Sequence, residues 1–241
     1  MPRRTNMKLL LFIVGCVWVV DLYAQKSVDV TTGNASAMSP NFFTVVNGEP
    51  IVFAKFTQLV SGTPYFRDEW MRGNVVMNGA EKQYAGILLK LDLYQNEVHY
   101  QSLSGVEMIA TTPIQKVILF DTAAEQIINF VNGQFIEASS PVRGWYILLT
   151  EGNVMLFKQI RKHLTENKPY SSATVEQSIS NTFHYYILYK GNFTEVKKIR
   201  DLPDLLSDKK SQISEYLKNN NISGKTDSDF ENVINYFNGL H

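Results

Sequence analysis

This sequence has no excess of charge of either sign, and it has little cysteine. The 241 residues include 23 basic and 23 acidic side chains and one cysteine, Cys16. A single cysteine cannot form a disulfide within the chain, so the fold must be held by its core alone. The balanced charge argues against a nucleic-acid partner, because proteins that bind nucleic acids normally carry a basic excess.

The short motifs that accompany common enzyme activities are also missing. The sequence contains no Gly-x-Ser-x-Gly, no glycine-rich phosphate loop, no His-Glu-x-x-His and no pair of cysteines. The usual local signs of hydrolases, nucleotide enzymes, zinc proteases and redox proteins are therefore absent. We expect no cofactor and no metal ion, and we favour a protein without catalytic activity.

Long apolar runs are confined to the start of the chain. Arg3, Arg4 and Lys8 precede an apolar stretch that ends near Ala24, a pattern typical of an export signal cleaved before Gln25. We predict a signal peptide at residues 1–24 and a flexible, polar lead-in at residues 25–41. No later apolar run is long enough to cross a bilayer, so no transmembrane span is expected in the mature chain.

Export without structural disulfides indicates a bacterial cell envelope, and we expect a periplasmic, outer-membrane-associated or secreted protein. Cys16 leaves an alternative open, because Ile13-Val14-Gly15-Cys16 also fits the motif at which lipoproteins are acylated. A lipid anchor is expected only if Cys16 is retained. We favour cleavage after Ala24, because the apolar run continues past Cys16.

The clearest structural signal is a β-hairpin in the first half of the chain. Leucines alternate with polar residues at residues 89–93, and a second alternating run follows Gln95 and Asn96. With these two residues as the turn, Asp92 lies opposite His99 and one face of the hairpin is buried. The predicted core face comprises Leu91, Leu93, Val98 and Tyr100.

Further short apolar runs are separated by glycine, proline and asparagine. They predict strands near residues 42–46, 51–59, 74–77, 83–94, 106–110, 116–121, 127–131, 135–138, 145–150, 154–163, 184–189 and 193–196. The first two runs are predicted to pair as a hairpin, and residues 165–180 are predicted to form a loop. Because no amphipathic helix separates the runs, we expect an antiparallel β-meander, either an open sheet or a barrel-like one.

The periodicity changes after residue 196, where apolar residues recur at helical spacing. Thr226 or Asp227 is a predicted cap for the last helix, and Gly239 is its predicted end. We expect two or three helices at residues 197–241, appended to a β domain at residues 42–196. The predicted fold class is mainly β with an α appendage (α+β).

Asp92 and His99 are the best candidates for acid–base chemistry, because the predicted register places a carboxylate beside an imidazole. An exposed ion pair explains the same arrangement, and we favour it because no nucleophile motif accompanies the two residues. His163 and Glu166 would meet on a helix as two metal ligands. Two ligands are too few for a site, so a solvated basic strand end is the preferred interpretation.

Two surfaces are candidates for binding. Tyr65, Phe66 and Trp70 belong to an aromatic-rich region that would serve as a ligand or partner surface or, as we favour, close one end of the sheet. The basic run at residues 158–162 would face anionic lipid or polysaccharide, or form a solvated face, which we take as the default.

One set of motifs extends over most of the mature chain. It comprises Trp70-x-x-Gly73-x-Val75, Leu89-Lys90-x-Asp92-x-Tyr94-x-Asn96, a hairpin at residues 189–193, and a tail with Lys209-Lys210 and Tyr236-Phe237. This set, with a signal that ends in Ala24-Gln25, resembles uncharacterised exported proteins of Bacteroidota. The resemblance implies export and the architecture described above, and it implies no particular activity.

The leading hypothesis is a non-enzymatic binding or scaffold protein of the bacterial envelope. It would present a sheet edge, or the aromatic-rich end of the sheet, to a protein or glycan partner. One alternative is a β-barrel carrier of a small apolar ligand. A hydrolase that uses Asp92 and His99 is a third, less favoured hypothesis.

Overall fold

A computed structural model describes residues 42–50, 57–78, 83–170 and 173–240. The predicted signal peptide, Cys16 and the predicted lead-in lie outside the described residues, as do residues 51–56 of a predicted strand.

The described residues form twelve strands, four α-helices and short 3₁₀ turns. The strands are β1 (Gly48–Pro50), β2 (Thr57–Ser61), β3 (Met71–Met77), β4 (Gln83–Asp92), β5 (Glu97–Gln101), β6 (Glu107–Ala110), β7 (Ile114–Asp121), β8 (Gln126–Asn132), β9 (Trp145–Thr150), β10 (Val154–Asn167), β11 (Val175–Tyr189) and β12 (Asn192–Val196). The helices are α1 (Phe42–Val45), α2 (Leu202–Leu205), α3 (Lys210–Asn219) and α4 (Asp227–Asn238), with 3₁₀ turns η2 (Gly133–Phe135), η3 (Ile199–Asp201) and η4 (Ser207–Lys209).

All twelve strands belong to one open, mixed sheet. Its order is β1-β6-β5-β4-β3-β7-β8-β9-β10-β11-β12, and β2 pairs with β11 in parallel, whereas the other described pairs are antiparallel. The end strands β1 and β12 do not pair with each other within the described residues, so the sheet is not closed. The predicted fold class, a mainly antiparallel β fold followed by helices, is confirmed.

The central hairpin has the predicted core face but a different register. Asp92 pairs with Glu97 and Lys90 pairs with His99, so the predicted pairing of Asp92 with His99 is wrong. The turn contains residues 93–96 rather than two residues, because the Asp92 carboxylate accepts hydrogen bonds from two backbone N–H groups inside it. The register changes by two residues and therefore leaves every side chain on its face. The predicted core face is buried at Leu91, Leu93, Val98 and Tyr100.

The first predicted hairpin is wrong. Residues 42–45 form helix α1, whose Phe42 is fully buried against the rings of Tyr84 and Tyr100. β1 pairs with β6, and β2 pairs with the distant β11. Packing of an aromatic side chain into the core has overridden the β propensity of this segment.

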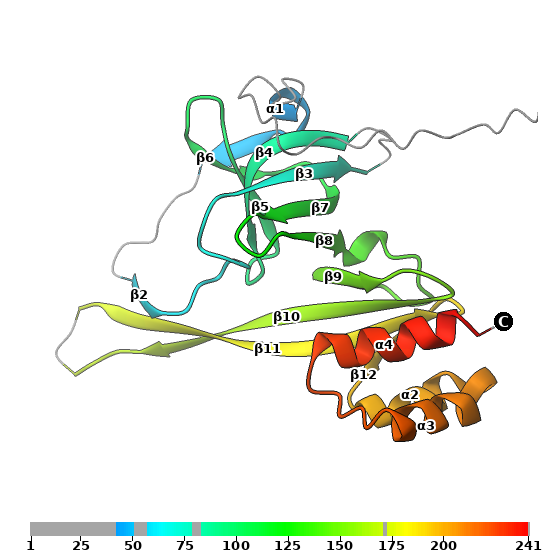
Figure 1. Ribbon diagram of the computed structural model, residues 1–241. Helices are drawn as coiled ribbons and strands as arrows, with labels where there is room; N and C mark the ends of the chain where they lie inside the picture. The colour runs from blue at the N-terminus through cyan, green and yellow to red at the C-terminus, as the bar shows by residue number, and fades with distance from the viewer. Residues whose placement is uncertain (1–41, 51–56, 79–82, 171–172, 241) are drawn as a thin grey trace, which may run out of the picture. The chain divides into compact units, whose positions relative to one another are not determined.

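The predicted loop at residues 165–180 is wrong at both of its ends, because residues 165–167 and 175–180 belong to the long hairpin of β10 and β11 (Figure 1). Ladder pairs extend from Val154–Tyr189 to Asn167–Glu176. His163 and Glu166 lie on β10, three residues apart, and therefore point to opposite faces of the strand. The helical geometry that would have brought them together as metal ligands does not form.

The helices share a core with the last strands of the sheet. The buried residues of this cluster include Leu156, Ile187, Leu202, Ile213, Phe230, Val233 and Phe237. Helix α4 begins at a capping box, in which Thr226 Oγ1 accepts from the Asp229 N–H at 3.2 Å, and it ends before Gly239 as predicted. No helix of the described chain is long and apolar enough to span a membrane.

Candidate functional site

The most prominent unsatisfied feature of the sheet is one edge of β10. β9 pairs with β10 only through the partners of residues 156–158, whereas β11 pairs with β10 along its whole length. Among the described strands, none pairs with residues 159–167 on the β9 side. Alternate residues of this nine-residue stretch direct their backbone N–H and C=O groups to that side, so about four or five residues present unpaired donors and acceptors there, over about 30 Å.

A cleft lies where the β9–β10 pairing ends. We call it the β10 cleft; it has a volume of about 260 Å³ and is open to solvent. Leu93, Asn96, Arg143, Gly144 and Trp145 line it together with residues 159–163 of β10. The buried Trp145 indole N–H donates to the Asn96 carbonyl at 3.3 Å, which connects the cleft to the central hairpin.

The charged residues that line this cleft are all basic or histidine. They are Arg143, Arg161, Lys162 and His163, and no acidic residue lines it. The Arg143 and Lys162 side chains make no hydrogen bond or ion pair with any described residue. Burial lowers the pKa of the half-buried Lys162, and the longer-range attraction of Asp92 only partly opposes this. An anion in the cleft would therefore stabilise cations that the chain itself leaves unpaired.

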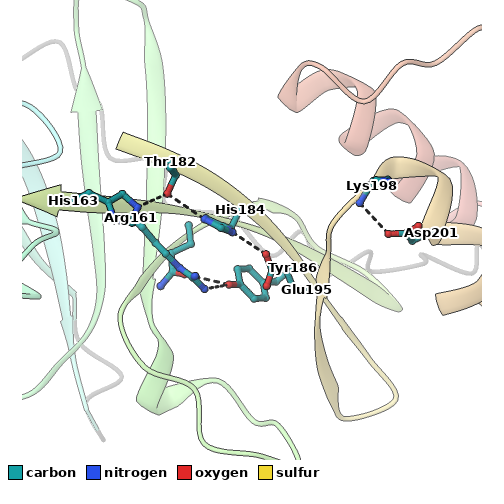
Figure 2. A network of polar contacts seen from close by, with 9 residues as sticks. Arg161, His163, Thr182, His184, Tyr186, Glu195, Lys198 and Asp201 are labelled. Carbon is teal, nitrogen blue, oxygen red and sulfur yellow. Dashed lines mark hydrogen bonds and ion pairs between the residues drawn. The ribbon is translucent and has the colours of Figure 1, made fainter. Parts of the chain in front are cut away.

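Arg161 is held in position by its neighbours on the same face of the sheet (Figure 2). Its Nε–H donates to Gln159 Oε1 at 2.8 Å, and its Nη2–H donates to the Tyr186 hydroxyl. Burial raises the pKa of Tyr186, and it raises that of the adjoining Tyr146 to about 12, so both rings stay neutral. The guanidinium is thus oriented by uncharged groups, and it forms no ion pair with a carboxylate of the described chain.

His163 is connected to a carboxylate through two further side chains (Figure 2). His163 Nε2 lies 2.8 Å from Thr182 Oγ1, which lies 3.2 Å from His184 Nε2, and His184 Nδ1 lies 2.8 Å from Glu195 Oε1. Because an ionised carboxylate only accepts, His184 Nδ1–H donates to Glu195. When His184 is neutral, its Nε2 accepts from the Thr182 hydroxyl, whose oxygen in turn accepts from His163 Nε2–H. This row orients the His163 ring at the edge of the β10 cleft.

The order of hydroxyl, imidazole and carboxylate in this row is also that of nucleophilic hydrolases. Thr182 is exposed, however, and neither Thr182, His184 nor Glu195 lines the β10 cleft. The β10 cleft therefore does not place a substrate next to this hydroxyl. Within the described chain no three His, Cys, Asp or Glu side chains are grouped so that they could hold a metal ion.

Asp92 and His99, the acid–base candidates, are buried on the same face but are not joined by a contact between described residues. The Asp92 carboxylate is occupied by the backbone N–H groups of the turn. His99 Nδ1 lies 3.0 Å from Glu107, while its Nε2 has no hydrogen-bond partner and lies 3.5 Å from Glu97. The geometry does not place a carboxylate behind an imidazole that faces a cleft.

The aromatic residues Tyr65, Phe66 and Trp70 are half-buried and engaged inside the molecule. The Lys90 ammonium lies 4.9 Å from the centre of the Tyr65 ring and 5.1 Å from that of Trp70. Phe66 packs edge-to-face on the buried Phe130, with ring centres 5.0 Å apart. These contacts hold Phe66 against the main hydrophobic core and place Tyr65 and Trp70 beside Lys90.

Sequence reasoning identified the basic run on β10 and missed Arg143. Arg143 belongs to the irregular segment between β8 and β9, where a strand was predicted at residues 135–138 and the structure has η2 and a loop. No local pattern shows that this loop lies beside residues 159–163.

No model of a protein family, no curated protein and no solved structure matches this chain.

Proposed function

We propose that this chain is a non-enzymatic binding or scaffold protein, exported to the bacterial cell envelope, that holds a protein or glycan partner at the free edge of β10. The observation that carries the proposal is that the edge of residues 159–167, with which no described strand pairs on the β9 side, lies beside the β10 cleft. Strand edges are recurrent sites for partner recognition, because the backbone supplies regular hydrogen bonds and adjoining side chains supply specificity.

Charges on an edge strand also discourage unwanted pairing between copies, which explains part of the basic run. That role does not require Arg143, which comes from a separate loop, or the fixed orientation of Arg161. Convergence of cations from two segments on one cleft supports a binding role.

The two other hypotheses have less support. A barrel carrier would need a closed sheet, whereas the sheet of the described residues is open, and the β10 cleft is open to solvent rather than enclosed. A hydrolase would need Asp92 and His99 in contact within a cleft, whereas each of them binds other partners and neither lines the β10 cleft.

Blocking the β10 edge should release the partner. Thr165 is exposed on this edge, so Thr165→Cys can be labelled with a bulky maleimide in protein purified from its own envelope fraction. In the proposed mature forms Cys16 is either removed with the signal or lipidated on sulfur, so the introduced thiol is the reactive one. Native mass spectrometry should show a companion mass before labelling and its loss afterwards.

Lys218→Cys, on the exposed surface of α3, is the matched control, and its labelling should leave the companion bound. A companion that survives the label at residue 165, or a bare monomer in the gently purified envelope fraction, would contradict the proposed function.

A further inference from the structure

The β10 cleft combines charge with an open row of backbone groups, and the two features together restrict its ligand. The side chains of Arg143 and Lys162 lack partners within the described chain, and Arg161 keeps its positive charge uncompensated by a carboxylate. Carboxylates, phosphates and sulfates would satisfy this charge equally well. The charge alone therefore indicates an anionic ligand, but it does not distinguish a polypeptide from a sugar or a lipid.

The unpaired backbone edge of β10 indicates which class of molecule bears the anionic groups. Residues 159–163 line the cleft with the edge that no described strand pairs, and the edge continues to residue 167. An extended polypeptide matches such a row with its own alternating N–H and C=O groups, whereas a sugar or a lipid headgroup does not repeat at that spacing. The incoming strand would continue in line with β9, beyond Trp145.

A second copy of this chain fits poorly at this edge. Pairing β10 with β10 would bring the basic runs of two copies together, and like charges on adjoining strands are destabilising. The complementary partner therefore carries acidic residues.

Strand geometry assigns positions to those acidic residues. Arg161 and His163 point to one face of β10, and Lys162 points to the other. Residues of a partner strand opposite these three positions would each face a basic or imidazole group. The flanking positions face Ile160, which packs against the main core, and Leu164. The matching segment has a short acidic centre with apolar residues on both sides.

We infer that the β10 cleft and the adjoining edge of β10 bind, by strand addition, an extended segment of a partner protein in which about three acidic residues are flanked by apolar ones. This inference rests on the proposed binding function and adds the class of partner. Within such a complex the acidic side chains contact Arg143, Arg161 and Lys162, and the partner backbone completes the ladder at residues 159–167.

The test uses the full mature chain and synthetic fluorescent peptides of about nine residues. One peptide has three glutamates at its centre, flanked by valines and then threonines, and a second has the same composition with the glutamates moved to its ends. Fluorescence anisotropy should show tighter binding of the first peptide by about tenfold or more, weakening as salt is added.

Arg143→Glu should weaken binding of the first peptide by about tenfold or more, since an attractive charge becomes a repulsive one. The exposed Arg143 side chain makes no hydrogen bond or ion pair with a described residue, so this variant should fold normally, which circular dichroism checks. Arg72→Glu, an exposed basic position on β3, is the matched control and should bind as the unchanged protein does.

Equal binding of both peptides would overturn strand addition, because charge alone would then explain the affinity. Binding of an acidic oligosaccharide such as oligogalacturonate, with neither peptide bound, would overturn the polypeptide class. Absence of any binding would overturn the inference as a whole. If the envelope companion is nevertheless lost on labelling Thr165→Cys, the proposed function stands and only the acidic strand is refuted.

Discussion

Replacing Phe157 with alanine is expected to lower the free energy of unfolding by about 3–5 kcal/mol. Phe157 is 1% exposed on β10, between β9 and β11, and it packs against the rings of Tyr146 and Phe193 with centres 6.4 and 5.4 Å away. The backbone of a central strand cannot collapse into the space left by the ring, so the cavity adds to the lost burial. Chemical denaturation of the two proteins measures the difference.

Ile127→Ala is the control for this experiment. Ile127 is also an apolar strand residue, but its side chain is 63% exposed on β8. Its truncation should change the free energy of unfolding by less than about 0.5 kcal/mol. A Phe157→Ala protein as stable as the control would show that Phe157 is not buried where β10 pairs with both β9 and β11.

Adding one methyl group at Gly73 is expected to be the second most damaging change. A Cβ atom there would lie 2.6 Å from the carbonyl oxygen of Ile118 and 2.9 Å from Leu89 Cδ1. β3 is paired on both sides, with β4 and β7, so the backbone oxygen cannot move away without breaking a ladder. We expect Gly73→Ala to lower the free energy of unfolding by about 3 kcal/mol, at the upper end of overpacking effects.

Gly239→Ala tests whether the effect arises from the close approach. Gly239 has φ of −84°, and its nearest atoms would lie 3.5 Å from an added Cβ, an ordinary contact distance. Thermal unfolding of both variants should show a large decrease in Tm for Gly73→Ala and almost none for Gly239→Ala. Equal decreases would mean that β3 is not packed between β4 and β7 as described.

The local alternation of apolar and polar residues predicted many of the strands in this sheet. It gave the wrong register where a side chain forms hydrogen bonds with the backbone of a turn. The leucines of β4 showed which face is buried, because a period of two is visible in the sequence. The register was wrong because Asp92 caps the turn and Asn96 adopts φ of 63°, which together make a longer turn. The aspartate immediately before the turn was the sequence feature that could have indicated this longer turn.

Non-local pairing could not be predicted. The polar residues after Leu164 resemble a loop by composition, yet the long ladder between β10 and β11 makes them strands. The parallel pairing of β2 with β11 joins Gln58 to Glu176, more than a hundred residues apart in sequence, and no local pattern marks it. Such pairs are decided by tertiary packing rather than by local propensity.

The candidate site was predictable in part. The basic run from Lys158 to His163 is visible in the sequence, and its strand conformation was expected. The free edge of β10 arises because the β9–β10 ladder ends at Lys158, and this depends on the lengths of the two paired strands. The approach of Arg143 from its loop depends on the same pairing. These features follow from the sheet and not from either segment alone.

The most direct test of the proposed function is hydrogen–deuterium exchange of the chain alone and in complex with its envelope companion. Partner binding at the free edge of β10 should slow exchange by about tenfold or more at outward-pointing amides of residues 159–167 and leave the helices unchanged. Unchanged exchange along that edge, with new protection at Tyr65 and Trp70 or over α3 and α4, would contradict the account and place the partner elsewhere.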